Sequence, residues 1–222
     1  AAREFLEEGK GSIKVTETSL KNYLGKERYT VNRLNDADDI GIVRGLAWTS
    51  VGGDTLEIEV NVMPGKGELL LTGQLGDVMK ESAMAGISYI RSVSREYGID
   101  DKFFKENDIH IHIPEGAVPK DGPSAGITMA TAMTSAITKL PVRADIAMTG
   151  EITLRGRVLP IGGLKEKLLA AKNAGIRLVL VPEKNRPDVA EISSEIKKGL
   201  EIRFVSHMDE VLKAALVKNS EN

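Results

Sequence analysis

The sequence predicts an α/β fold built on a mixed β-sheet, with N-terminal β-hairpins followed by α/β units. In the first half, apolar and polar residues alternate in runs joined by Gly- and Pro-containing turns, which is typical of antiparallel strands. In the second half, apolar strand patterns alternate with helical patterns, which favours parallel strand pairs. The chain has 222 residues, of which 41% are apolar and 28% charged. This is the composition of a globular protein long enough to bury a substantial core.

The first 28 residues carry few apolar side chains and differ from the rest of the chain. Residues 1–9 predict the end of a helix, and Ile13–Thr16 predicts a short strand. Ser19–Gly25 predicts a short helix with Thr18 as its N-cap. Residues 29–44 predict a linker, because the segment is mostly polar. The dense apolar pattern that follows predicts a main domain at 45–222.

The main domain is expected to begin with a hairpin. Leu46–Val51 and Thr55–Met63 predict two strands joined by a turn at Gly52–Asp54. Apolar and polar residues alternate strictly in the second strand, so one of its faces is expected to be buried. A second turn at Pro64–Gly65 leads into a third strand at Gly67–Gly73.

The elements after this hairpin region follow from the change of period. Asp77–Gly98 predicts a long helix, Asp108–Ile113 a strand of strict period two, and Ser124–Lys139 an apolar helix rich in small residues. Further strands are expected at 145–154, 157–161, 177–182 and 201–206, and further helices at 163–174, 187–192 and 207–217.

Composition excludes several kinds of protein. The net charge is −2, whereas a general nucleic-acid binder needs a basic surplus. The chain has no cysteine, which excludes disulfide scaffolds, cysteine nucleophiles and iron–sulfur sites. No apolar run approaches a membrane span, and no phosphate-binding loop motif is present. The chain begins without Met or a signal-peptide pattern, so we expect a soluble piece of a longer protein.

Ser124 is the first candidate catalytic residue, as a nucleophile. The loop Pro114–Pro123 contains three prolines and two glycines and delivers Ser124 to the start of an apolar helix. Unpaired N–H groups at a helix start can stabilise an oxyanion, so Gly122, Pro123 and Ala125 are candidate oxyanion or substrate-proximal residues. The alternative is that Ser124 is simply an N-cap.

A nucleophilic serine needs a base. The chain has three histidines, and His110 and His112 lie two apart on one strand face. Such a pair is also a weak signal for a metal site, although partly exposed structural histidines are the simpler interpretation. The other kind of base is a lysine whose pKa is lowered by burial.

Three lysines on the predicted helix at 163–174 are candidates for that role. On a helical projection Lys167 and Lys172 flank the apolar stripe at similar angles, while Lys165 lies farther away. Small neighbours slightly favour Lys167 for burial, but the angles alone do not choose. The alternative is that each lysine extends its amine into water. Thr149 is either a turn residue or a hydroxyl that orients a neighbouring amine. Asp121 either forms an Asx-turn or places its carboxylate on the active-site groups when the site is idle.

Three segments carry a specific resemblance. PKDGPSAG (119–126), MTGEITLRGRVLPIGGLKEKLLAA (148–171) and GLAWTSVGGD (45–54) strongly resemble the proteolytic domain of Lon, a family of ATP-dependent proteases. The similarity is to the common bacterial and mitochondrial form and extends from about Gly45 to Leu216. Residues 1–28 resemble the last part of the small helical subdomain of the family's ATPase module.

The resemblance implies a serine–lysine dyad. It assigns the nucleophile to Ser124, the general base to Lys167 and the supporting hydroxyl to Thr149. It assigns to Asp121 the aspartate that blocks the site in the inactive form. The choice of Lys167 over Lys172 thus comes from the resemblance.

The resemblance also implies an assembly. Similar domains form six-membered rings around a chamber, into which an ATPase ring threads unfolded chain for protein quality control in the cytoplasm. ATP and Mg²⁺ would bind the ATPase module, so no cofactor, metal, membrane or nucleic-acid site is expected in this chain. The expected partners are unfolded proteins or peptides and further copies of the chain.

The sequence is compatible with two other functions. One is a catalytically silent module that forms rings or docks peptides once it is separated from the ATPase. The other is a metal-binding domain that uses His110 and His112.

Overall fold

The structure is a computed structural model that describes residues 6, 12–25, 37–49, 52–114 and 118–217. The chain divides into two compact units, residues 1–32 and 33–222, which are described separately. The division at residues 28 and 44 stays a prediction.

The first unit contains helix α2 (Glu17–Leu24). Its N-cap is Thr16 rather than Thr18, because Thr16 and Ser19 form a reciprocal capping box. Ile13–Thr16 is not a strand: it has no partner strand among the described residues, and Thr16 starts the helix instead. The helix expected at 1–9 lies, apart from Leu6, outside the described residues.

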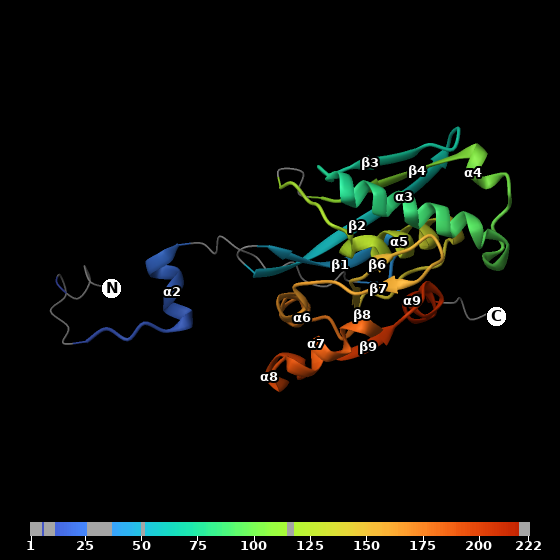
Figure 1. The fold of residues 1–222 in the computed structure, drawn as a ribbon. Helices are drawn as coiled ribbons and strands as arrows, with labels where there is room; N and C mark the ends of the chain where they lie inside the picture. The colour runs from blue at the N-terminus through green and yellow to red at the C-terminus, as the bar shows by residue number, and fades with distance from the viewer. Residues whose placement is uncertain (1–5, 7–11, 26–36, 50–51, 115–117, 218–222) are drawn as a thin grey trace, which may run out of the picture. The chain divides into compact units, whose positions relative to one another are not determined.

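The second unit is built on a seven-stranded mixed sheet of order β3-β4-β2-β1-β5-β8-β9 (Figure 1). The β1–β2 and β2–β4 pairs are antiparallel, and the other pairs are parallel. This confirms the α/β class with a mixed sheet. The strands are β1 (Ile42–Thr49), β2 (Gly52–Pro64), β3 (Leu69–Thr72), β4 (Asn107–His112), β5 (Ile146–Met148), β8 (Leu178–Pro182) and β9 (Glu201–Val205).

Two details of the predicted hairpins are wrong. Gly52–Asp54 does not form the turn but belongs to β2, where Gly52 pairs with Thr49. Strand β3 pairs in parallel with β4 and not with β2. The reason lies in Asp108, whose carboxylate accepts hydrogen bonds from the N–H groups of Lys66, Gly67 and Glu68 and so holds the turn before β3 beside β4.

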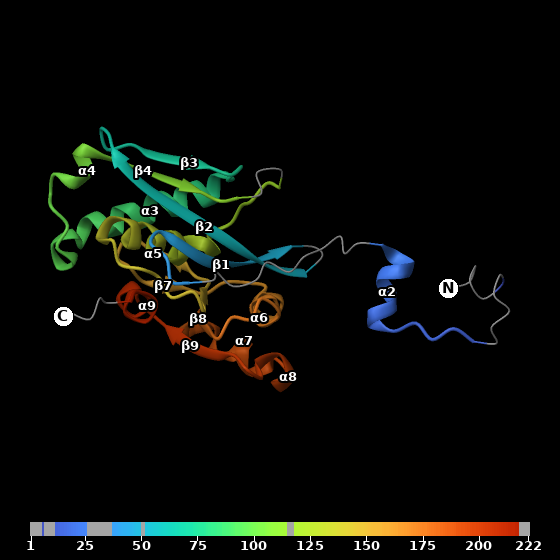
Figure 2. The ribbon, with the colours of Figure 1, turned by 180° about the vertical axis from the view of Figure 1, so that it is seen from behind.

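Helices cover the two faces of the central sheet (Figures 1 and 2). Along β5 and β8 successive side chains enter opposite cores, as Ile146 and Ala147 do, because strand side chains alternate. Helices α3, α5 and α9 contribute to one core, and α6 and α7 to the other. The helices are α3 (Asp77–Ser92), α4 (Phe103–Glu106), α5 (Gly126–Thr138), α6 (Leu164–Asn173), α7 (Arg186–Glu191), α8 (Ser194–Lys197) and α9 (Met208–Ala215).

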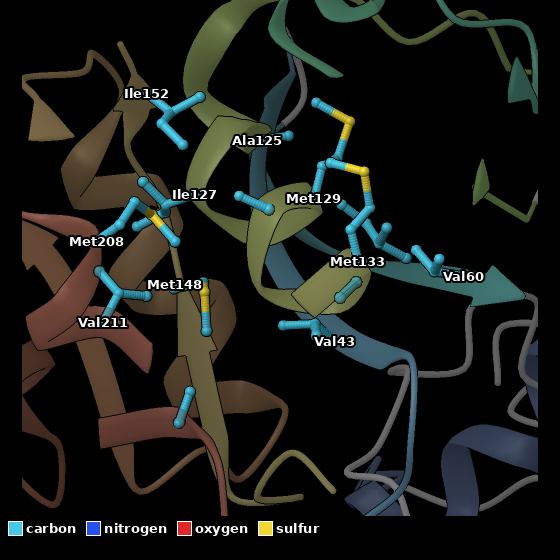
Figure 3. Close-up of a cluster of buried hydrophobic side chains, with 14 of the residues drawn as sticks. Val43, Val60, Ala125, Ile127, Met129, Met133, Met148, Ile152, Met208 and Val211 are labelled. Carbon is cyan, nitrogen blue, oxygen red and sulfur yellow. The ribbon is translucent and has the colours of Figure 1, made fainter. Parts of the chain in front are cut away.

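Helix α5 is the centre of the larger core (Figure 3). Every residue from Gly126 to Ile137 is buried. Met129 and Met133 point toward β2, while Ile127 lies near Met148 and Met208. Small residues let α3 approach closely, since a Cβ on Gly86 would lie 3.0 Å from Met133. The buried environment explains why apolar and small residues dominate the helix, as its sequence predicts, while the hydroxyls of Thr131 and Thr134 donate to backbone oxygens one turn earlier.

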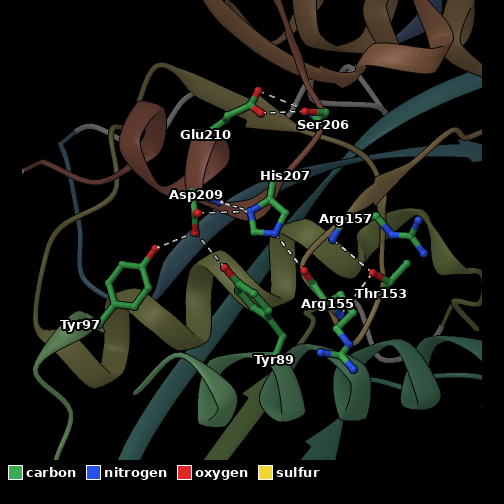
Figure 4. A network of polar contacts seen from close by, with 9 residues as sticks. All are labelled: Tyr89, Tyr97, Thr153, Arg155, Arg157, Ser206, His207, Asp209 and Glu210. Carbon is green, nitrogen blue, oxygen red and sulfur yellow. Dashed lines mark hydrogen bonds and ion pairs between the residues drawn. The ribbon is translucent and has the colours of Figure 1, made fainter. Parts of the chain in front are cut away.

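A polar network fastens α9 to α3 and to the hairpin formed by β6 (Glu151–Ile152) and β7 (Val158–Leu159) (Figure 4). Tyr89 and Tyr97 donate to the carboxylate of Asp209. Burial, with the Asp209 charge, raises the pKa of Tyr97 to about 12. The Nε2–H of His207 donates to Arg155 O at 2.9 Å. His207 is therefore a structural histidine.

Candidate active site

Ser124 lies in a single 3₁₀ turn, Pro123–Ala125, directly before α5. Gly122 enters this turn with φ 120°, a backbone conformation that favours glycine. No side-chain capping bond is made at the start of the turn or of α5, so the N-cap alternative for Ser124 is wrong. Among the described residues no hydrogen bond is made by the Ser124 Oγ, and Ser124 as a whole is half-buried.

The structure separates the three lysines of α6. Lys165 is exposed, and the amine of Lys172 reaches the backbone oxygen of Glu195 in α8. Lys167 is 3% exposed, and burial lowers its pKa from 10.5 to about 8. Its Nζ donates to Thr149 Oγ1 at 3.1 Å. Lys167 is thus the one of the three placed to act as a neutral base.

Thr149 connects the lysine to the serine turn. It is fully buried, and its hydroxyl accepts from Lys167 and donates to Ser124 O at 3.3 Å. The next amide, Gly150 N–H, donates to the same oxygen at 2.8 Å, and Ile127 N–H donates to Gly150 O at 3.1 Å. The β5–β6 connection is therefore hydrogen-bonded both to the Ser124 turn and to the first turn of α5.

Ser124 and Lys167 line one cavity of about 840 Å³. Most of its wall is apolar, and Trp48 stands at it with 60% of its surface exposed. Pro123 and Ala125 also line it, whereas Gly122 does not. The apolar and aromatic lining residues are Leu46, Ala47, Trp48, Leu56, Met79, Val118, Pro119, Pro160 and Ile161.

The amides near Ser124 are partly engaged. Gly122 N–H donates to the Asp121 carboxylate at 2.8 Å, and Gly126 N–H donates to Pro123 O. Pro123 has no N–H group, so it can only contact a substrate. The oxyanion role of Gly122 and Ala125 stays a prediction.

Asp121 caps helix α3. The helix begins after Gly76, which has no side chain with which to cap it. The Asp121 carboxylate takes this place by accepting from Met79 N–H at 3.0 Å. A Cβ on Gly76 would lie 2.2 Å from Asp121 Cγ, so this close approach requires glycine. The blocking role that the resemblance assigns to Asp121 stays a prediction.

This contact predicts a transferable cap. Asp121→Gly should lower the free energy of unfolding by about 1 kcal/mol or more, because α3 loses its cap and the loop gains freedom. Adding Gly76→Ser should restore about 1 kcal/mol, since Gly76 already has the extended conformation of an N-cap, with φ −69° and ψ 173°. Urea unfolding of both variants measures this. If Asp121→Gly unfolds at the same urea concentration as the wild type, or if adding Gly76→Ser does not raise the midpoint of Asp121→Gly, the cap is contradicted.

Two glycines hold α6 against the β1–β2 hairpin. A Cβ on Gly53 would lie 2.0 Å from the backbone oxygen of Glu166, beside Lys167. Gly163, the N-cap of α6 with φ 67°, lies against the ring of Trp48. The sequence assigned Gly53 to a turn, and its packing role carries no local signal.

His110 and His112 lie on the sheet face that points away from the larger core. Thr72 Oγ1 lies 2.9 Å from His110 Nε2 and 2.8 Å from His112 Nδ1, so the Thr72 hydroxyl bonds to both imidazoles. The described part of the chain holds no group of three metal-ligand side chains. The metal-site interpretation therefore lacks a third ligand within the ranges that the structure describes. No helix among the described residues is long and apolar enough to span a membrane.

The mixed α/β fold, together with a serine and a buried lysine at one cavity, fits the class of serine hydrolases in which a lysine takes the place of the usual histidine base. The family described as "Lon protease (S16) C-terminal proteolytic domain" matches residues 14–218. The chain belongs to this family, whose members are serine peptidases.

Full-length relatives agree with the family match. The chain is 69% identical over 205 residues to the "Lon protease" of Lachnoclostridium phytofermentans, covering 92% of this chain and 25% of that protein. It is 60% identical over 210 residues to the "Lon protease" of Clostridioides difficile, covering 95% and 27% respectively. It is 56% identical over 223 residues to "Lon protease 2" of Desulfotalea psychrophila, covering 100% and 29%. The chain thus spans little more than a quarter of these relatives.

Proposed function

We propose that this domain cleaves unfolded polypeptides with Ser124 as nucleophile and Lys167 as general base. The observation that carries the proposal is the buried Lys167 amine, which is linked through Thr149 to the Ser124 turn, with Ser124 and Lys167 lining the same, mostly apolar cavity. Such a lysine can be neutral near physiological pH, which a base requires.

The reaction follows from these positions. Neutral Lys167 removes the proton of the Ser124 hydroxyl as the oxygen attacks a peptide carbonyl carbon. Backbone N–H groups beside Ser124 stabilise the oxyanion that forms. The carbon–nitrogen bond then breaks, and the Lys167 ammonium protonates the leaving amine. Water, deprotonated by Lys167, hydrolyses the acyl-enzyme and regenerates the hydroxyl.

The cavity favours an extended, apolar stretch of substrate. Leu46, Leu56 and Met79 offer an apolar wall, and exposed Trp48 adds an aromatic surface. Long apolar stretches are accessible mainly in unfolded chains, because folded proteins bury most of their large apolar side chains. Unfolded protein or peptide is therefore the proposed substrate.

The assembly around the domain is proposed from the family. Six copies would form a ring in the cytoplasm, and an ATPase module outside this chain would bind ATP and Mg²⁺ and deliver the substrate. Within the domain itself the proposed chemistry needs no cofactor, metal, membrane or nucleic acid.

The pH dependence follows from the sign of the Lys167 shift. Only neutral Lys167 acts as a base, and its pKa is about 8. We expect kcat/KM to rise about tenfold per pH unit below that value and to level off above it. Initial rates with one peptide between pH 6 and 10 test this. A midpoint near 6.5 would point to a histidine base instead.

Thr149→Val tests the link between the two residues. Valine keeps the shape but removes the hydroxyl that orients the Lys167 amine, so kcat/KM should fall about tenfold. Thr131→Val is the matched control, because that buried hydroxyl donates only to Ile127 O within α5. Similar losses in both variants would show that Thr149 acts through stability alone.

A second candidate function is a silent, ring-forming or peptide-docking module. It is favoured by the absence, among the described residues, of a hydrogen bond between Ser124 Oγ and Lys167 Nζ. Hydrolysis of an unstructured fluorogenic peptide without ATP decides between the two. Cleavage by the chain but not by Ser124→Ala supports the peptidase; no cleavage by either supports the silent module.

A further inference from the structure

Asn185 is a buried polar residue that the proposed chemistry does not use. It ends the short 3₁₀ turn Glu183–Asn185 after β8 and is 3% exposed. Its Oδ1 accepts from Ile161 N–H at 3.0 Å, and its Nδ2 donates to Ile161 O at 2.9 Å. The second Nδ2–H donates to Asp188 Oδ2 at 2.6 Å. The carboxamide therefore uses one acceptor and both donors, which also fixes its orientation.

The backbone that Asn185 holds belongs to the active-site wall. Pro160, Ile161 and Gly162 line the same cavity as Ser124 and Lys167. Within the described part of the chain, the two bonds from Asn185 are the hydrogen bonds of the backbone between Pro160 and Gly162. The carboxamide thus replaces the strand pairing that β7 loses after Leu159.

The same segment leads directly into the helix of the base. Gly163 is the N-cap of α6, and Lys167 N–H donates to Gly163 O at 3.1 Å. A shift of Ile161 would therefore be passed on within one helical turn to Lys167. It would also open the cavity wall to water.

We propose that Asn185 is a positioning residue of the peptidase site, whose carboxamide clamps the Ile161 backbone and so fixes the cavity wall and the start of the Lys167 helix. This rests on the function proposed above. Active-site groups need such support, because a displacement of about 1 Å can cost about 10²-fold in rate.

Asn185→Asp and Asn185→Leu test the clamp. Aspartate keeps the shape and one acceptor but loses the donor to Ile161 O and faces the Asp188 carboxylate. Leucine removes both bonds. Two control variants leave the clamp intact: Asp188→Ala removes only the third bond, and Val189→Ala creates a cavity in the neighbouring helix α7.

Two readouts separate positioning from stability. The first is kcat on the fluorogenic peptide at pH 7, which should fall roughly 10²-fold in both Asn185 variants and little in the controls. The second is the pKa of Lys167, measured from the pH dependence of its acetylation by acetic anhydride with mass spectrometry of the peptides. It should rise toward its ordinary value when water reaches the amine. None of the variants replaces the other charged residues that line the cavity, Asp54, Lys120 and Asp121.

The outcomes distinguish this proposal from the peptidase function. Cleavage that Ser124→Ala retains would remove the peptidase function, yet the Lys167 titration would still decide about Asn185. A folded Asn185→Asp or Asn185→Leu variant with the wild-type Lys167 pKa would overturn the clamp. An equal shift in Val189→Ala would do the same, since it would show a general effect of loosening the core.

Discussion

Lys167→Met is expected to abolish peptide cleavage while making the domain more stable. Methionine fits the apolar site but cannot accept a proton, so kcat/KM should fall about 10³-fold or more. In the folded state the Lys167 pKa is about 8, below the unfolded value of 10.5, so the unfolded chain binds more protons between these values. Stability therefore rises with pH across this window, and below it the buried lysine costs about 3 kcal/mol. Methionine removes that cost.

The measurement combines peptide hydrolysis with urea unfolding at pH 7 and pH 10. The stability gain of Lys167→Met should be largest at pH 7 and should shrink at pH 10. Lys165→Met is the matched control on the exposed side of α6, and it should retain activity. Lys167→Arg should also be inactive, because a guanidinium stays charged. Activity in either Lys167 variant would remove the lysine from its role as base.

Gly53→Ala is expected to destabilise the domain by about 3 kcal/mol or more. The added Cβ would lie 2.0 Å from the backbone oxygen of Glu166, and neither backbone is a flexible side chain that can move aside. The helix must shift away from β2, and Lys167 must shift with it. Activity should therefore fall further than stability alone explains. Thermal unfolding and hydrolysis below the unfolding transition measure the two effects.

Gly162→Ala is the control for this substitution. Gly162 lies in the same cavity wall, but a Cβ there meets no atom within 4 Å. It should keep the free energy of unfolding near that of the wild type, so it controls for the stability effect of Gly53→Ala. If Gly53→Ala is tolerated equally well, the close packing of α6 on the hairpin does not position the lysine.

The sequence predicted the layers of the fold because its apolar periods are long and regular. The alternation in β2 and β4 and the helical periods of α3, α5 and α9 define elements that the structure confirms, although α3 ends at Ser92 and the predicted stretch up to Gly98 continues as a 3₁₀ turn. The pairing of β3 with β4 was not predictable, because it depends on Asp108, distant in sequence, holding the intervening turn. The prediction of a strand at Ile13–Thr16 was wrong, because a local sequence pattern does not show whether a partner strand exists.

The site was only partly accessible to sequence reasoning. Helical angles alone did not decide whether Lys167 or Lys172 is the buried base. The structure decides it, because the Lys172 amine bonds to α8, a helix that the sequence pattern did not predict. Asn185 precedes Arg186 and Pro187 in what resembles an ordinary turn, and nothing local indicates that its carboxamide is buried. Gly53 likewise signals a turn, although its role is a helix contact. These contacts join segments distant in the chain, which a single sequence does not reveal.

The most direct test of the dyad is covalent labelling of the domain with a fluorophosphonate, located by peptide mass spectrometry. Such reagents react with an activated serine hydroxyl without requiring a bound substrate. We predict one adduct, on Ser124, which forms faster as the pH rises through about 8 and is lost in Lys167→Met. An adduct on another residue, or labelling of Ser124 at the same rate in Lys167→Met, would contradict the serine–lysine mechanism.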